Sequence, residues 1–196
     1  MSDIKTDSVI KFGNYDWLVL DVQGGSALII TNNIIERREY NVKNKKLTWE
    51  KCTLRKYLNS EFLKNFSDDE QKRIIETRIS NNNIWVDTKG GKDTSDKIFI
   101  LSLEDADKYF GNTGDYQSIK RINGYGEVDI KGIYLSNHYN NLRIAKFNNE
   151  ASDWWLRSPG IASDTAVIIE RKGHVFTNGG ALNCKFGIRP ALWMRL

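Results

Sequence analysis

The residues best suited to catalysis are few and scattered along this chain of 196 residues. There are two histidines, His138 and His174, and two cysteines, Cys52 and Cys184. A Ser-His-Asp triad would need one of those histidines, and no serine stands in the G-x-S-x-G pattern that exposes a nucleophile. We therefore expect both histidines to be surface or loop residues, and we predict no catalytic residues and no enzyme.

The two cysteines lack the spacing of a metal site. Neither belongs to a C-x-x-C pair, and neither has a histidine at ligand spacing. We expect two free, buried thiols in a reducing compartment, with a single disulfide between them as the alternative. The glycine-containing segment 88–95 does not have phosphate-loop spacing, and the acidic run 68–70 opens a predicted helix, where the helix dipole favours carboxylates. No metal and no cofactor are predicted.

A more coherent pattern lies near the end of the chain. Residues 165–180 form two alternating runs about an Arg-Lys-Gly turn, which predicts a β-hairpin. Successive strand side chains point to opposite faces, so alternate residues share a face. One such face carries Ala166, Ile168 and Glu170 on the first strand, and His174, Phe176 and Asn178 on the second. This mixture suits an adaptable binding surface; the alternative is ordinary solvent-facing polarity with Phe176 in the core.

Directly before this hairpin stands the sequence DWWLRSPG, residues 153–160. Because Trp154 and Trp155 are adjacent on a predicted strand, one indole is expected in the core and the other on an outer or ligand face. Arg157 here and Arg189 later each offer five donors in a planar fork, which can satisfy carbonyls of irregular backbone. Arg157 as a substrate clamp is the functional alternative. Pro159 and Pro190 fix φ, and so set where strands end.

The elements that position these residues are mainly strands. Residues 8–33 alternate and are rich in β-branched side chains, which predicts an antiparallel meander. Residues 48–66 place apolar side chains at spacings of three and four, as an amphipathic helix does, and a capping box at Ser67 begins a second helix. A closing strand is predicted at 186–194.

Between these segments the pattern is weaker. A short strand is predicted at 97–101, followed by a helix capped by Ser102. Residues 111–150 are dominated by Asn, Gly, Tyr and Ser, which indicates long surface loops.

Composition is that of an ordinary globular chain. It is 40% hydrophobic and 28% charged, with a net charge of +4. No repeat or composition shift divides it, so residues 1–196 are predicted to form a single α+β domain. No leader pattern and no apolar run long enough for a membrane span is present, so we expect a cytoplasmic protein without a membrane partner.

Several blocks resemble an uncharacterised bacterial and phage domain family that ends in WWLRSP and GVRPALW. They are DWWLRSPG, GIRPALW, FGNYDWLVLDVQGGSALII, WEKCTLRKYLNSEF, GGKDTSDKIFILSLEDADKYFG and NLRIAKFNN. That family in turn is similar to the C-type-lectin-like fold of formylglycine-generating enzymes and of the variable proteins of diversity-generating retroelements. The paired cysteines of the enzymes have no counterpart beside Cys184, so their activity is not implied.

The resemblance implies a single C-type-lectin-like domain with antiparallel strands, two to three helices and long loops. It implies a macromolecular ligand, most plausibly a protein, bound by segment 153–186 and neighbouring loops. The structural residues would be Arg157, Pro159, Gly187, Arg189 and Pro190. The ligand-binding residues would be Trp155, Asp164, Ile168, Glu170, His174, Phe176, Asn178, Asn183 and Lys185.

Nucleic acid is the alternative partner. Segment 37–56 carries eight basic residues against Glu39 and Glu50, with Tyr40 and Trp49 interspersed. Such a segment could contact phosphates and stack on bases. More often, such a segment is a solvated loop and helix face.

Overall fold

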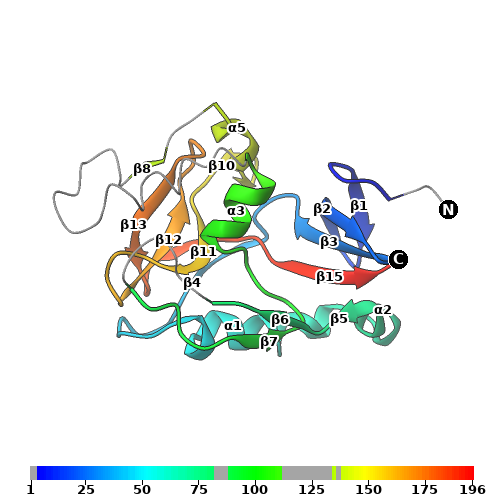
Figure 1. The fold of residues 1–196 in the computed structure, drawn as a ribbon, viewed down its shortest axis with the longest axis horizontal. Coiled ribbons are helices and arrows are strands. Elements are labelled where there is room, and N and C mark those ends of the chain that lie inside the picture. Colours follow the sequence, from blue (N-terminus) through cyan, green and yellow to red (C-terminus); the bar gives the residue numbers. More distant parts are fainter. Residues whose placement is uncertain (1–3, 82–87, 112–133, 136–137) are drawn as a thin grey trace.

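The computed structural model describes residues 4–81, 88–111, 134–135 and 138–196. Most of the elements are antiparallel strands, accompanied by a few short helices, so the chain belongs to the α+β class, as the sequence predicts. The strands form one sheet of six strands and one of five. Figure 1 shows these two sheets side by side, with α1 and α2 below them, α3 in the middle of the view and α5 at the top. Within the described residues no helix is long and apolar enough to span a membrane.

The five-stranded sheet joins the first strands of the chain to the last. Strands β1 (Val9–Phe12), β2 (Tyr15–Gln23) and β3 (Ser26–Thr31) form the predicted antiparallel meander. The C-terminal strand β15 (Ala191–Arg195) pairs with β3, and β5 (Ile74–Ile75) completes the sheet beyond it. The C-terminal residues are therefore an integral part of this sheet.

The six-stranded sheet contains the predicted hairpin. The strand order is β4 (Glu36–Glu39), β14 (Lys185–Ile188), β11 (Trp154–Pro159), β12 (Thr165–Ile169), β13 (Val175–Ala181) and β8 (Tyr134–Leu135). Among these described strands β11 and β14 run parallel, and the other neighbours are antiparallel. The hairpin prediction is confirmed, since its two runs are β12 and β13.

The single closing strand predicted at 186–194 is wrong. Strand β14 ends at Ile188 and β15 begins at Ala191, and the two belong to different sheets. Proline has no N–H and a fixed φ, so Pro190 interrupts the ladder. Arg189 and Pro190 consequently form one of the crossings between the sheets, and Figure 1 shows β15 running from the side of the six-stranded sheet towards the C-terminus.

The predicted helix at 48–66 is also divided. It consists of a 3₁₀ turn η1 (Trp49–Lys51), a short helix α1 (Thr53–Leu58) and a second 3₁₀ turn η2 (Phe62–Asn65). Cys52 is extended and caps α1, while the Asn59 side chain bonds the backbone of Lys97 and Ile98 and ends it. Six of the seven apolar positions of the pattern are nevertheless buried, and the seventh, Tyr57, is partly buried. The six are Trp49, Cys52, Leu54, Leu58, Phe62 and Phe66.

Two helix starts are confirmed by capping boxes. Ser67 caps α2 (Asp68–Arg73) with Glu70, and Ser102 caps α3 (Leu103–Tyr109) with Asp105. Each side chain satisfies an N–H that the first helical turn leaves unpaired.

The remaining short elements lie between β5 and β11 in the sequence. The strand predicted at 97–101 is displaced to β7 (Thr94–Asp96), which pairs with β6 (Thr77–Ile79), while 97–101 makes one bridge, from Phe99 to Ala191. Helix α5 (Asn140–Arg143) and the small pair β9 (Lys146–Phe147) and β10 (Glu150–Ala151) precede β11. Of the predicted loop region 111–150, residues 112–133 and 136–137 lie outside the described residues.

The core is rich in tryptophan. Trp17, Trp49, Trp154 and Trp155 are all almost completely buried, and each indole N–H donates to an acceptor: Phe12 O, Asp96 Oδ2, Arg143 O and Arg38 O respectively. Burying a large side chain contributes about 1.5–3 kcal/mol, and the hydrogen bonds remove the cost of burying the N–H. These contacts fix the strands that carry the candidate surface.

Candidate functional site

The β12–β13 hairpin has the register that places the predicted residues on one face. Ile168 lies opposite Phe176, and the Glu170 N–H donates to His174 O at 2.8 Å. Gly173 turns the chain at φ +78°, and a Cβ there would overlap the backbone of Asn140 in α5. The turn is thus packed tightly against a neighbouring helix.

The prediction that one of the two adjacent indoles faces outward is wrong. Trp154 packs beside Phe110 on one side of the sheet, and Trp155 packs against Tyr40 and Phe186 on the other. Alternation does separate the two side chains, but both faces of this sheet are covered. Trp155 and Ile168, 0% and 4% exposed, therefore do not reach the surface.

The exposed predicted residues fall at two opposite ends of the hairpin. Glu170 and His174 lie at the turn, with side chains 29% exposed and 3.9 Å between His174 Nδ1 and Glu170 Oε2. Asp164 and Asn183 lie at the other end, where Leu182 N donates to Asp164 O. Since a strand rises about 3.3 Å per residue, the seven residues of β13 separate these ends by roughly 20 Å.

Phe176 and Asn178 lie between the two ends. Phe176 is partly buried and packs against the core, in agreement with the alternative that placed it there. Asn178 is half-buried beside an irregularity in the β12–β13 register, and its carbonyl accepts from Thr165 Oγ1 at 2.9 Å. Lys185, on β14, is exposed and pairs with Glu39 at 3.6 Å.

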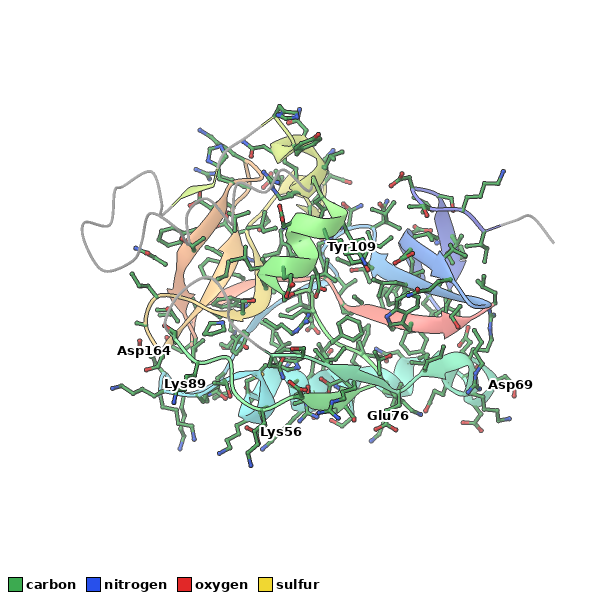
Figure 2. All side chains as sticks on the ribbon, in the orientation of Figure 1. Lys56, Asp69, Glu76, Lys89, Tyr109 and Asp164 are labelled. Atoms are coloured by element: carbon green, nitrogen blue, oxygen red, sulfur yellow. The ribbon has the colours of Figure 1, made fainter. Side chains whose placement is uncertain are left out.

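The end of the hairpin near Asp164 gathers several loops, and we call residues 41–47, 88–92, 160–164 and 182–184 the loop end. Asn41 N donates to Leu182 O, and Leu47 N donates to Ser163 O. Thr88 Oγ1 donates to Ile161 O at 2.8 Å. These bonds hold together four segments that are distant in sequence, at the ends of strands of the six-stranded sheet. Figure 2 labels Lys89 and Asp164 in this part of the molecule, and the Thr88–Ile161 bond joins the segments that carry them.

Arg157 has the contacts of a residue that holds irregular backbone. Its Nη1 donates to Ile100 O at 2.9 Å and to Asp105 Oδ2 at 2.6 Å, and its Nη2 donates to Ser80 O. Burial raises the pKa of Asp105, but the Arg157 guanidinium and the Ser102 N–H outweigh it and leave that pKa below its usual value. Pro159 is buried at the end of the same strand.

Arg189 makes comparable contacts at the crossing between the sheets. Its Nε donates to Thr31 O and its Nη2 to Asn32 O, while the guanidinium lies 4.8 Å from the Trp154 ring. Burial lowers its pKa to about 9. The Pro190 carbonyl accepts from Thr31 N, and a Cβ on Gly187 would crowd Ile34.

Sequence reasoning missed a third buried arginine, Arg143. It is 0% exposed, and it donates to Gly173 O at 2.8 Å and to Phe110 O at 3.1 Å. It therefore fixes the hairpin turn to helices α3 and α5. The arginine stands in the block NLRIAKFNN after a polar run, and this block has no periodicity from which its burial could be inferred.

The thiols lie apart and unpaired. Cys52 is buried, as expected, whereas Cys184 is exposed because it stands in the turn before β14 at the loop end. Burial raises the pKa of the Cys52 thiol to about 12. Among the described residues no group of three His, Cys, Asp or Glu side chains could hold a metal ion.

The basic segment 37–56 does not present the aromatic residues that would stack on bases. Tyr40 and Trp49 are each 1% exposed, because Tyr40 packs between Trp49 and Trp155. Arg55 is paired with the buried Asp96 at 2.6 Å. The segment keeps exposed lysines for phosphate contact but loses its predicted stacking partners.

Comparison with known proteins identifies one family. The model of the family described as Domain of unknown function (DUF6273) matches residues 24–196, so the chain belongs to that family. No curated protein and no solved structure matches the chain significantly.

Proposed function

We propose that this DUF6273 domain is a non-enzymatic recognition module that binds a protein through segment 153–186 and the loops beside it. The observation that supports the proposal most strongly is the loop end, where four loops are held by hydrogen bonds on a sheet with fully buried tryptophans. Loops on a rigid scaffold are where binding residues concentrate. Preorganised loops also lose less conformational entropy on binding.

The side chains of the loop end suit a protein partner. Ile161 is 47% exposed, Val42 is 66% exposed, and Asn183 is exposed beside them in the same group of loops. Apolar side chains within a polar surrounding are the usual composition of a protein interface. We include the C-type-lectin-like architecture in this proposal, on the strength of the sequence blocks that resemble that fold.

A position-resolved cross-linking experiment tests the proposal. A photoreactive amino acid is introduced at Ile161, at Asn183, or at His174 on the opposite end of the hairpin, and each folded chain is irradiated in lysate of the source cell. We expect the same protein to be cross-linked from the first two positions and not from His174. Cross-linking from His174 alone would move the site to the hairpin turn and overturn the assignment to the loop end.

Matched variants provide the control. Ile161→Ser with Asn183→Ala removes side chains at the loop end, whereas Glu170→Ala with His174→Ala removes side chains at the turn. All four positions are at least partly exposed, so the free energy of unfolding of each variant is expected to lie within ~0.5 kcal/mol of that of the native chain. Only the loop-end variant should lose the cross-linked partner. If neither variant changes its capture, the loop end is not the binding surface.

A further inference from the structure

The loop end and the adjoining 3₁₀ turn carry an unusually one-sided charge. Together they contain six lysines and two carboxylates, Glu50 and Asp164. All six lysines are exposed: Lys43, Lys45, Lys46, Lys51, Lys89 and Lys92. We call these six residues the lysine cluster.

Two segments distant in sequence are packed together to form the cluster. A Cβ on Gly91 would overlap the side chain of Thr48, so the segment 88–92 lies directly against 43–51. The bond from Trp49 Nε1 to Asp96 Oδ2, 2.9 Å long, continues this contact. In Figure 1 the cyan loop before α1 runs beside the green segment before β7, in agreement with these contacts.

The residues that the structure describes supply no paired carboxylate to the lysine cluster. Among the described residues, none of its six ammonium groups lies within 4.0 Å of a carboxylate. Neighbouring basic residues differ, since Arg55 is paired with Asp96 and Lys185 with Glu39. Like charges gathered without partners repel one another, and an anionic surface placed against them removes that repulsion and steers association.

The apolar side chains beside the cluster distinguish between anionic partners. Val42 precedes Lys43, and Ile161 is tied through its carbonyl to Thr88, the residue before Lys89. A phosphate backbone gains little from exposed aliphatic side chains, and single-stranded nucleic acid gains affinity from aromatic stacking, which the buried Tyr40 and Trp49 cannot provide. An acidic protein segment uses both the lysines and the aliphatic side chains.

We propose that the loop end binds an acidic protein segment in which carboxylates are interspersed with apolar side chains. The carboxylates pair with the lysine cluster, and the apolar side chains contact Val42 and Ile161. This inference deepens the proposed function, since it specifies the chemistry of the protein that the loop end recognises.

The test uses a labelled peptide of about 16 residues that alternates Glu or Asp with Leu, measured by fluorescence anisotropy. The chain is compared with Lys43→Glu/Lys45→Glu/Lys46→Glu and with a control of equal charge change, Lys5→Glu/Lys64→Glu/Lys146→Glu, whose lysines are exposed elsewhere. We expect the loop-end variant to lose affinity about tenfold or more, the control to lose less than about threefold, and native binding to weaken with salt.

Three outcomes would overturn the inference. Equal loss in both variants would mean that net charge alone attracts the peptide. Tighter binding of an oligonucleotide of similar length, lost in the loop-end variant, would assign the cluster to nucleic acid. Cross-linking of a cellular partner from Ile161 that survives the three lysine reversals would refute the charge inference while leaving the proposed function intact. Absence of any partner at Ile161, together with peptide binding that follows the lysines, would support the charge inference and refute the cellular function as proposed.

Discussion

At the scale of single residues, the Arg157–Asp105 pair is the clearest structural interaction. Replacing Arg157 by Ala removes donors to two backbone carbonyls and leaves the Asp105 carboxylate, 29% exposed, without its cation. We expect the free energy of unfolding at neutral pH to fall by about 2–3 kcal/mol, measured by urea titration. Arg157→Lys keeps the charge without the planar fork, so its free energy of unfolding should lie between those of the native chain and Arg157→Ala. An unchanged urea midpoint would contradict the structural role.

The same pair predicts how stability depends on pH. Asp105 has a pKa below its usual value in the folded chain, so its pairing stabilises the fold above the ordinary Asp pKa of about 3.9. That contribution is lost as pH falls through the lower, folded-state pKa. The difference in unfolding free energy between the native chain and Arg157→Ala should therefore shrink on acidification below about pH 4. A difference that stays constant would show that the ion pair contributes nothing.

The two cysteines should differ sharply in reactivity. Burial raises the pKa of Cys52 to about 12, so hardly any thiolate forms there near neutral pH, whereas Cys184 is exposed. The thiolate is the reactive species. A thiol-specific reagent should modify one cysteine in the folded chain and both in denaturant, with peptide mapping assigning the first to Cys184. Modification of Cys52 without unfolding would require an opening that this fold does not show.

At the scale of elements, the sequence indicates which side chains are buried better than where the helix is interrupted. The apolar spacing in 48–66 correctly identifies the inward positions, because burial follows from periodicity whether or not the helix is continuous. The interruption depends on Asn59, whose side chain bonds a segment almost forty residues away. No local pattern encodes such a contact.

Asn59 should therefore matter more than its partial exposure suggests. Its amide donates to Arg55 O and Ile98 O and accepts from Lys97 N and Ile98 N. Asn59→Ala leaves these backbone groups unpaired, and we expect a loss of about 2–3 kcal/mol in the free energy of unfolding. Ser60→Ala, at the exposed neighbouring position, is the control and should change it by less than ~0.5 kcal/mol. Equal effects would mean that Asn59 does not fix the helix end.

At the scale of the whole molecule, the sequence predicts the two faces of the hairpin but not what packs against them. Alternation predicts that Glu170 and Ile169 lie on opposite faces of the strand, and the register agrees. It did not show that both faces are covered, so Trp155 appeared available for a ligand. Nor did it show that segment 88–92 packs on Thr48. These relations arise from long-range packing, which periodicity does not report.

Arg189 should couple the two sheets. It bonds carbonyls of Thr31 and Asn32 at the end of β3, and it lies over Trp154 in the other sheet. Arg189→Ala removes these hydrogen bonds and the packing of the aliphatic part of the side chain. Their loss outweighs the gain from no longer burying a cation, so we expect the free energy of unfolding to fall by about 2–3 kcal/mol.

Hydrogen exchange followed by mass spectrometry measures where the loss occurs. Because Arg189 stands where the chain crosses from β14 to β15, peptides from both sheets should lose protection in the Arg189→Ala variant, among them those containing β3 and β11. Arg157→Ala, whose contacts lie around α3 and β11, is the matched comparison and should leave the β1–β3 meander protected. If Arg189→Ala loosens only the six-stranded sheet, Arg189 supports its own sheet and the two sheets are held together by the apolar core alone.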